Sequence, residues 1–453
     1  MDRTSVIEAY RERKQLHRLK PSMFNRCVTT PVGLTLYNSA KGTKSILRIS
    51  QQHAEKVQTL ISLPEVSNDN SKIVQKLIDL GYLVPENLDE KALRSYLQME
   101  YLSDTKLRLV VHVTRACNFR CTYCYMDFEP VFLSEATQQG IVNYVRNNIH
   151  KYSGVMISWF GGEPLLGVEI IERVSNELLA ICKAHCKPYT ASITTNGYRL
   201  TPCVYERLKR CRVKNFTITI DGKKELHDTQ RVLADGSPTF DTIINNLLYI
   251  KENCKNSMQR FNLRSNITKD HLDSLIEYYD YMENLFGNDT RFQFFIREVA
   301  DYGGMRVKTL YPKLMDGLQG VYRLLSNLGG NSSFYSHFSD LAIGGYTCAA
   351  KKQNKYTIGC LGTVCKCDED LESFPLGYLD ADGCMNLDEV SGAEWSGIRN
   401  LSEKCDDCFF SCCCMMEQCP LRRYDRNGVC GINFTEIDAL IEFAGVAMNV
   451  DTL

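Results

Sequence analysis

Three cysteines in the segment Arg115–Tyr125 have the spacing that a metal cluster needs. Cys117, Cys121 and Cys124 follow the pattern C-x3-C-x2-C directly after a strand-like run, Leu107–Thr114. Iron–sulfur clusters are ordinarily closed by four cysteine thiolates, so three thiolates would leave one iron open to a substrate or a cofactor. Catalytic zinc sites keep one ligand position open in the same way. The spacing therefore predicts a reactive cluster.

Two later segments carry groups that could hold an ammonium and a carboxylate. Gly161, Gly162 and Glu163 lie in a Gly-Gly-Glu-Pro sequence directly after a second predicted strand, Val155–Phe160. Glycines let a backbone approach a ligand closely, and carbonyl and carboxylate oxygens accept hydrogen bonds from an ammonium. Arg231 could bind a carboxylate through two parallel hydrogen bonds. The alternative for the segment that contains Arg231 is a turn whose arginine lies on the surface.

These motifs together resemble those of the radical S-adenosylmethionine (SAM) superfamily. The resemblance implies that Cys117, Cys121 and Cys124 bind a [4Fe–4S] cluster whose open iron chelates SAM. It implies the following SAM contacts: Tyr123 at the adenine, Gly161, Gly162 and Glu163 at the amino group, Thr219 and Arg231 at the carboxylate, and Asn266 at the ribose. A three-cysteine zinc site is the alternative, but no fourth ligand lies nearby in the sequence.

The chemistry that the resemblance implies follows from the open iron. An electron delivered to the cluster, by a flavodoxin or a ferredoxin, would cleave the sulfonium of SAM. The resulting 5′-deoxyadenosyl radical would abstract a hydrogen atom from the substrate. The cofactor carries this reaction, while the protein supplies position and a dry site.

The elements that must position these residues alternate along residues 105–310. Predicted strands are Leu107–Thr114, Val155–Phe160, Ala191–Thr195, Phe216–Asp221, Phe261–Ile267 and Phe292–Ile296. Helical stretches between them indicate an α/β fold with a parallel sheet and helices outside. Six such units suit a partial (β/α)6 TIM barrel. Active sites of these folds lie at the carboxyl ends of the strands, where every barrel motif named above falls.

Residues 1–95 predict a separate small module. A strand pair, Val32–Tyr37 and Ile46–Ile49, precedes two helices and a short strand, Tyr82–Val84. This order resembles a winged-helix module of the kind that recognises precursor peptides. A peptide could extend an exposed strand edge of such a module. The alternative is a subdomain that only caps the barrel.

Residues 340–440 are dense in cysteine and poor in regular periodicity, so we expect metal ligation rather than apolar packing to supply their core. The spacing of the cysteines resembles the SPASM domain, which carries two auxiliary [4Fe–4S] clusters. The resemblance assigns three cysteines to the first cluster: Cys348, Cys367 and Cys419. It assigns four to the second: Cys405, Cys408, Cys414 and Cys430, with the adjacent Cys412 and Cys413 as alternatives to Cys414. Zinc ribbons are the alternative, because C-x2-C is equally typical of zinc.

Two points in this region stay open at the level of sequence. Cys360 or Cys365 could be the fourth ligand of the first auxiliary cluster; if neither reaches it, an open iron there could bind a substrate thiolate. Asp368 follows Cys367, and resembles an aspartate that anaerobic sulfatase maturases use as a base. Its alternative role is to orient a ligand or to face solvent.

The composition of the whole chain limits the partners and the cellular compartment that we expect. The 453 residues carry a net charge of −1, which predicts neither a nucleic-acid partner nor attraction to a membrane. The N-terminus lacks the form of a signal peptide, so we expect a cytoplasmic protein. The cytosol keeps thiols reduced, and the 21 cysteines therefore favour metal ligation over disulfides.

A recognition module combined with a SPASM-like region resembles the maturases of ribosomally made peptides. The leading expectation is a radical SAM enzyme that joins a cysteine sulfur to a carbon of another residue, which gives an intramolecular thioether in a precursor peptide. A maturase that forms carbon–carbon crosslinks is the nearest alternative. An anaerobic sulfatase-type enzyme that generates formylglycine comes next, and a non-catalytic peptide-binding scaffold is the least favoured.

Overall fold

The computed structural model describes residues 18–255, 258–299, 318–327, 338–368, 375–396, 405–414, 430, 432–448, 450 and 452–453.

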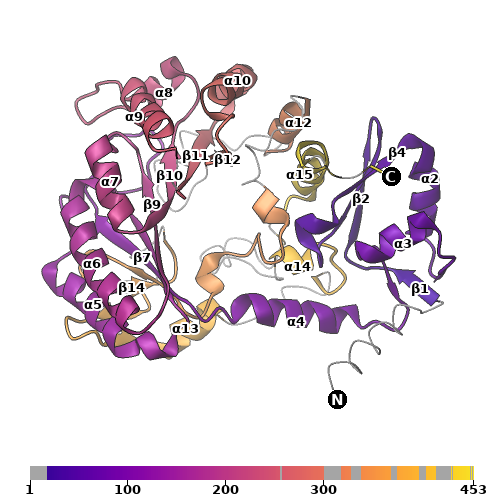
Figure 1. The fold of residues 1–453 in the computed structure, drawn as a ribbon, viewed down its shortest axis with the longest axis horizontal. Helices are drawn as coiled ribbons and strands as arrows, with labels where there is room; N and C mark the ends of the chain where they lie inside the picture. The colour runs from indigo at the N-terminus through magenta and orange to yellow at the C-terminus, as the bar shows by residue number, and fades with distance from the viewer. Residues whose placement is uncertain are drawn as a thin grey trace.

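Six parallel strands form the wall of a partial barrel (Figure 1). In spatial order they are β7 (Leu107–Thr114), β8 (Val155–Gly161), β9 (Tyr189–Thr195), β10 (Val213–Thr219), β11 (Arg260–Ile267) and β12 (Phe292–Glu298). The helices on the outer side are α5 (Glu135–Asn148), α6 (Val168–Ala184), α7 (Pro202–Arg210), α8 (Lys224–Gln230), α9 (Phe240–Asn253) and α10 (Leu275–Phe286). The predicted α/β fold with a (β/α)6 barrel is confirmed.

Successive side chains of each strand alternate between two environments. In β7, Leu107, Leu109 and Val111 are buried in the main hydrophobic core beneath the helices. Burying one such side chain stabilises the fold by roughly 1.5–3 kcal/mol. His112 lies on the opposite side of the strand, in edge contact with Phe160 of β8. The barrel interior is therefore the polar side of the sheet, where a charged cofactor can be accommodated.

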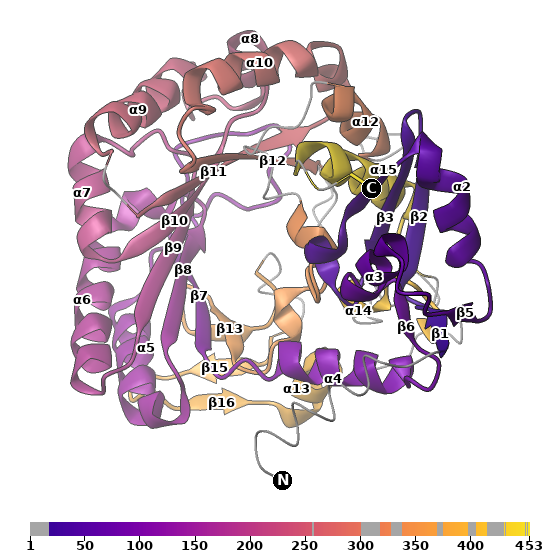
Figure 2. The same cartoon turned by 45° about the vertical axis from the view of Figure 1, so that its right-hand side comes forward.

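The sheet continues past β7 into the cysteine-rich region (Figure 2). Strand β13 (Lys355–Ile358) is parallel to β7, and an antiparallel meander follows it: β14 (Thr363–Cys365), β15 (Gly377–Leu379) and β16 (Met385–Leu387). Ile358, Val364 and Leu379 join the main core. The expectation that this region lacks an apolar core was wrong for residues 355–387, because these strands extend the barrel sheet.

The N-terminal module consists of two small antiparallel sheets with two helices. Its elements are β1 (Arg18–Pro21), β2 (Asn25–Thr30), β3 (Gly33–Asn38), β4 (Leu47–Ser50), α2 (Gln51–Leu60), β5 (Val66–Ser67), α3 (Lys72–Asp79) and β6 (Leu83–Pro85). The sheet orders are β2-β3-β4 and β5-β1-β6. The expected strand pair, helices and last strand are present, whereas β1, β2 and β5 were not predicted. The module has a hydrophobic core of its own.

Buried and ionic contacts fix this module to the rest of the chain. Arg26 of β2 makes two hydrogen bonds, of 2.7 and 2.6 Å, to the carboxylate of Asp438 in α15 (Phe434–Ala447). The Tyr37 hydroxyl donates to the carbonyl of Leu341 at 2.6 Å. Helix α4 (Glu90–Leu102) connects the module to the barrel, and α12 (Gln319–Asn327) packs on α15 (Figure 1). In the part of the chain described, no helix is long and apolar enough to cross a membrane.

Candidate active site at the carboxyl ends of the barrel strands

A cavity of about 170 Å³ lies where the barrel strands end. It brings together most of the residues that the motifs singled out, from the ends of four different strands: Cys117, Cys121, Tyr123, Cys124, Gly161, Gly162, Thr219, Arg231 and Asn266. Phe160, Thr194, Thr195, Asn196, Arg264, Glu298 and Val299 complete much of the lining. Residues up to 182 positions apart in the chain thus share one site, since Cys117 and Val299 both line it (299 − 117 = 182).

The three thiols of the first motif are sheltered from water. Burial raises the pKa of the Cys117 thiol to about 12 and that of the Cys121 thiol to about 11. Such thiols lose their protons when a metal centre compensates the charge, so the donor set and its burial fit a cluster. Among the residues that the structure describes, no three His, Cys, Asp or Glu side chains converge on a single metal ion. The thiolates of a four-iron cluster bind different iron atoms and need not converge in this way.

The glycine pair after β8 is required by the neighbouring loop. A Cβ atom on Gly161, whose φ is +118°, would lie 2.3 Å from the Thr114 carbonyl oxygen. A Cβ on Gly162 would lie 2.2 Å from the Ala116 carbonyl oxygen. Either contact is far inside van der Waals distance, so this loop can pack against the start of the cysteine loop only with glycine at both positions. The same two residues also line the cavity.

Glu163 lies outside the cavity lining, whereas the sequence resemblance implied that it contacts the amino group of SAM. Its side chain is 0% exposed and is not part of the cavity lining. Its carboxylate accepts hydrogen bonds from the Leu165 amide at 2.9 Å, the Thr195 hydroxyl at 2.7 Å and the Asn196 amide at 2.7 Å. Burial raises the pKa of this carboxyl group. Glu163 therefore joins the loop after β8 to the loop after β9, and Gly161 and Gly162 are left to face a ligand.

A network around Tyr123 holds Arg231 in the cavity wall. The Tyr123 hydroxyl donates to Asp221 and accepts from Arg231 Nη1 at 2.7 Å and from the Asn266 amide at 3.0 Å. Asn266 Oδ1 accepts from Arg264 Nε at 2.7 Å. Nε of Arg231 is buried without a hydrogen-bond partner, and an arginine fork with a free donor fits a carboxylate. The cavity thus fits the carboxylate end of SAM.

Sequence reasoning did not single out Asp221, which is fully buried and accepts from the backbone amide of Asn266 at 2.7 Å. It placed the segments of Arg264 and Asn196 at strand ends but gave these two residues no role of their own; both are in the cavity lining. A signal for Asp221 existed, because an acidic residue directly after a buried apolar strand needs partners. Asn196 belongs to a Thr-Thr-Asn-Gly sequence that ends a predicted strand.

Asp368 lies beside the barrel interior and outside the cavity lining. Its carboxylate accepts from Lys355 and from the Thr357 hydroxyl, both on β13, the latter at 2.7 Å. Its backbone carbonyl lies 3.1 Å from Nε2 of His112. Burial lowers the pKa of His112 to about 4, so this imidazole is neutral and donates to that carbonyl through Nε2. The Asp368 side chain is therefore held by an ion pair.

Among the cysteines assigned to the second auxiliary cluster, Cys405, Cys408 and Cys430 lie near one another, and Cys414 ends α14 (Ser411–Cys414). Burial raises the pKa of Cys408, and the nearby thiols of Cys430 and Cys405 raise it further. Burial raises the pKa of Cys412 to about 12, with a smaller contribution from Cys408. Cys413 instead lies 2.8 Å from the Tyr37 hydroxyl. Cys412 is therefore a second candidate ligand beside the predicted Cys414.

The first auxiliary set is only partly described, because Cys419 lies outside the described residues. Cys348 is exposed at the start of a short 3-10 helix, Ala349–Lys351, and Cys367 is half-buried. Cys360 is buried and its sulfur lies 3.3 Å from the His112 carbonyl. Burial raises the pKa of Cys360 to about 11. The fourth ligand of this cluster stays a prediction.

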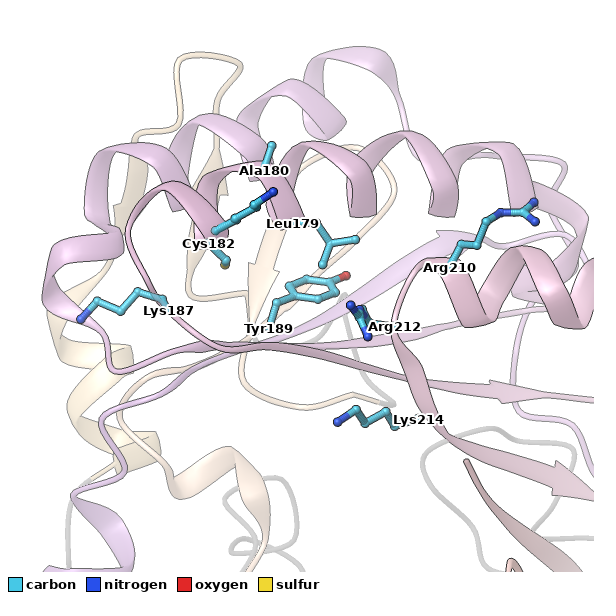
Figure 3. Close-up of a pocket in the computed structure, with 9 residues that line it drawn as sticks. Leu179, Ala180, Cys182, Lys187, Tyr189, Arg210, Arg212 and Lys214 are labelled. Carbon is cyan, nitrogen blue, oxygen red and sulfur yellow. The ribbon is translucent and has the colours of Figure 1, made fainter. Parts of the chain in front are cut away.

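A larger hollow, about 520 Å³, lies elsewhere, near the amino ends of β9 and β10. Figure 3 shows Tyr189 beneath α6, with Leu179 and Cys182 above its ring. Five cationic residues line it: Lys183, Lys187, Arg210, Arg212 and Lys214. No thiol set or acid–base pair of the motifs lies there, so the smaller cavity is the candidate active site.

Comparison with known proteins agrees with this geometry. Fe-coproporphyrin III synthase of Methanosarcina barkeri is 26% identical over 197 residues, 43% of this chain and 45% of the relative. Radical SAM cyclopropyl synthase TigE of Paramaledivibacter caminithermalis is 26% identical over 213 residues, 41% and 43% of the two chains. The serine-type anaerobic sulfatase-maturating enzyme of Bacteroides thetaiotaomicron is 27% identical over 157 residues, 32% and 36%. The chain spans less than half the length of each of these three curated relatives.

The solved structure of native anSMEcpe with bound AdoMet aligns with a TM-score of 0.54 at 19% identity, over 74% of this chain and 95% of that chain. The same protein with AdoMet and Kp18Cys peptide gives 0.52 at 18%, over 68% and 88%. These likenesses show the fold. Residues 111–279 match the model of the radical SAM superfamily, so this part of the chain is similar to a radical SAM domain.

Proposed function

We propose that this protein matures a ribosomally made precursor peptide by forming intramolecular thioethers between cysteine sulfur and carbon. One observation carries the proposal: the cavity that joins the three-thiol loop to Arg231 belongs to a chain in which Cys413, next to the predicted ligand Cys414, contacts Tyr37 of the N-terminal module. A thioether-forming enzyme needs a radical site, a place for a thiolate or an electron, and a means to hold a peptide. The chain offers a candidate for each.

The residues of the cavity would bind and orient the cofactor. Cys117, Cys121 and Cys124 would hold the cluster, Arg231 would pair with the SAM carboxylate, and the backbone of Gly161 and Gly162 would face the amine. When bound, the cluster and SAM supply a 5′-deoxyadenosyl radical. The buried wall would exclude water from that radical, which protects it from side reactions.

The hydrogen balance of the reaction gives the remaining cysteines a role. Each ring removes two hydrogens from the peptide. One is transferred to the deoxyadenosyl group, and the other leaves as the thiol proton and one electron. Two auxiliary clusters, held by the assignments given above, would accept that electron, and a flavodoxin or ferredoxin would supply the electron that cleaves SAM.

The N-terminal module supports a peptide substrate. We propose that it acts as a winged-helix recognition element, since an added strand can provide main-chain hydrogen bonds to an extended peptide. Relatives point the same way: one matures a sulfatase, and the aligned anSMEcpe structure holds a Kp18Cys peptide. The edge of β4 is already paired in part, because the Leu453 amide donates to the Arg48 carbonyl at 2.9 Å. An added strand would therefore use another edge or displace residues 452–453.

Formation of carbon–carbon crosslinks is the nearest second candidate, because it shares the radical step. Oxidation of the sulfatase type needs a base near the substrate. The Asp368 carboxylate is tied to Lys355 and Thr357 and does not line the cavity, which favours a role in orienting its neighbours.

The test uses reconstituted protein under anaerobic conditions with SAM, a reductant and the peptide encoded beside it. Mass spectrometry would follow deoxyadenosine and the peptide together. Loss of two hydrogens per ring, with those cysteines no longer alkylatable, supports thioethers. The same loss with cysteines still alkylatable would replace this proposal with carbon–carbon bonds, and a protein that forms no deoxyadenosine would refute both.

A further inference from the structure

Helix α4 buries a polar stripe. Glu90, Arg94 and Gln98 recur every four residues and are each 6% exposed, whereas Tyr96 and Met99 of the same helix are 60% and 67% exposed. A helix that packs on a protein ordinarily buries its apolar face. Helix α4 instead buries three polar side chains and exposes two large apolar ones. Buried polar groups need hydrogen-bond partners. The surface that α4 covers must therefore be polar.

That surface is the cysteine segment of the second auxiliary set. Helix α4 packs against α14, and Arg94 Nη1 donates to the Asp406 carbonyl at 2.9 Å. Arg94 Nη2 donates to the Asp406 carboxylate at 3.2 Å. The charges of Arg94 and Glu90 both act on the Cys412 thiol. The guanidinium is thus anchored on the backbone and side chain of Asp406, which lies between Cys405 and Cys408 in the sequence.

Two donors on the stripe are buried without partners among the described residues. They are Nε of Arg94 and Nε2 of Gln98. A buried donor left unpaired costs about 1–3 kcal/mol, so two on one helix face suggest an acceptor that binds there. Residues four apart lie on the same face of a helix, so the Gln98 donor lies on the face of α4 that carries Arg94. The sulfur atoms of an iron–sulfur cluster accept hydrogen bonds, and a thiolate-bound cluster is anionic.

We propose that Arg94 and Gln98 form the polar wall of the second auxiliary cluster and raise its reduction potential. The inference rests on the proposed function, which places that cluster at Cys405, Cys408 and Cys430. Hydrogen bonds to cluster sulfurs and nearby charge set the potentials of such clusters. A fixed positive charge stabilises the more negative, reduced form. The cluster would then take up the electron that each new thioether releases.

The experiment measures midpoint potentials in protein that lacks the first cluster. In a Cys117→Ala, Cys121→Ala, Cys124→Ala background, only auxiliary signals remain in a redox titration followed by electron paramagnetic resonance. The signal that Cys408→Ala removes identifies the second cluster. Arg94→Gln is compared with Arg94→Lys, which keeps the charge, and with Lys91→Gln, which removes an equal charge from the exposed side of α4, where Lys91 pairs with Asp407 at 3.2 Å.

Arg94→Gln should lower the reduction equilibrium constant about tenfold, or about 59 mV for one electron. Arg94→Lys and Lys91→Gln should stay near the parent value. Equal shifts for Arg94→Gln and Lys91→Gln, or no shift in either, would overturn the inference. If the Arg94→Gln protein binds less iron than the parent, the Gln98→Leu variant tests the inference instead. Its reduction equilibrium constant should fall about threefold, because one neutral hydrogen-bond donor is lost. Iron counts that show no auxiliary cluster in the parent would refute the proposed cluster set itself, and with it this inference.

Discussion

Replacing Glu163 with glutamine separates two roles that a Gly-Gly-Glu-Pro sequence could have. The carboxylate is buried and faces three donors: the amides of Leu165 and Asn196 and the hydroxyl of Thr195. Glutamine has the same shape but offers one acceptor oxygen and one NH2 group. The best placement keeps the oxygen toward Leu165 and Thr195, which leaves the NH2 group opposite the Asn196 amide.

The cost of this change follows from those three contacts. The unpaired Asn196 amide costs about 1–3 kcal/mol, and the other two bonds each weaken by about 1 kcal/mol when the acceptor loses its charge. Removal of a desolvated charge offsets part of this loss. We expect a net destabilisation of the loop after β9 of about 2 kcal/mol, which is roughly a 30-fold change in its opening equilibrium, since about 1.4 kcal/mol is tenfold.

Amide hydrogen exchange, measured by mass spectrometry, reports the opening of this loop directly. Peptides that cover residues 194–197 should exchange roughly 30-fold faster in Glu163→Gln, while SAM affinity falls by less than that factor. Thr195→Val is the matched control, because it removes one of the same three donors. The double variant should cost less than the sum of the two single variants. Unchanged exchange with a large loss of SAM affinity would show that Glu163 contacts SAM itself, and would refute the reasoning.

Three further predictions concern single residues of the site and its surroundings. Arg231→Gln should weaken SAM binding about 10- to 100-fold, because a hydrogen bond to a charged group contributes about 1.5–3 kcal/mol; anaerobic calorimetry measures it, and Arg231→Lys should lose less. Cys121→Ala should abolish deoxyadenosine formation. Detection of deoxyadenosine by chromatography with this variant would refute the cluster assignment. The free energy of unfolding should fall by about 2–3 kcal/mol between pH 6.5 and 4.5 because of His112. The pKa of this imidazole in the folded protein is about 4, so below pH 6.5 the unfolded chain binds a proton that the folded chain does not. His112→Asn should flatten that part of the profile in thermal melts.

The barrel could be predicted because its signals are local. The run Leu107–Thr114 matches β7 at both ends, and each motif lies next to the strand that positions it. Strand starts were less accurate: β9 begins at Tyr189 and β10 at Val213, two and three residues before the predicted starts. Tyr189, Thr190 and Lys214 are half-buried and Asn215 is exposed, so the apolar pattern there is weak.

Features that depend on distant parts of the chain could not be predicted. Lys355 of β13 pairs in register with Arg108 of β7, and no local pattern marks a pairing across such a separation. The polar stripe of α4 shows the same limit. Glu90 and Arg94 are charged, yet both are buried, because Ser22 and Asp406 provide partners from elsewhere in the chain.

The contacts of the N-terminal module constrain how a peptide could reach the radical site. Tyr37 bonds to Leu341 and lies beside Cys413, and Arg26 is paired with Asp438. Releasing the module would expose these buried groups, so the module holds one position relative to the cavity. A peptide bound to it would reach the cavity only with residues at a certain distance along its chain, since the r.m.s. length of a flexible linker grows with the square root of its residue number. The spacing between the recognition segment of the peptide and its modified cysteines should therefore matter more than the residues between them.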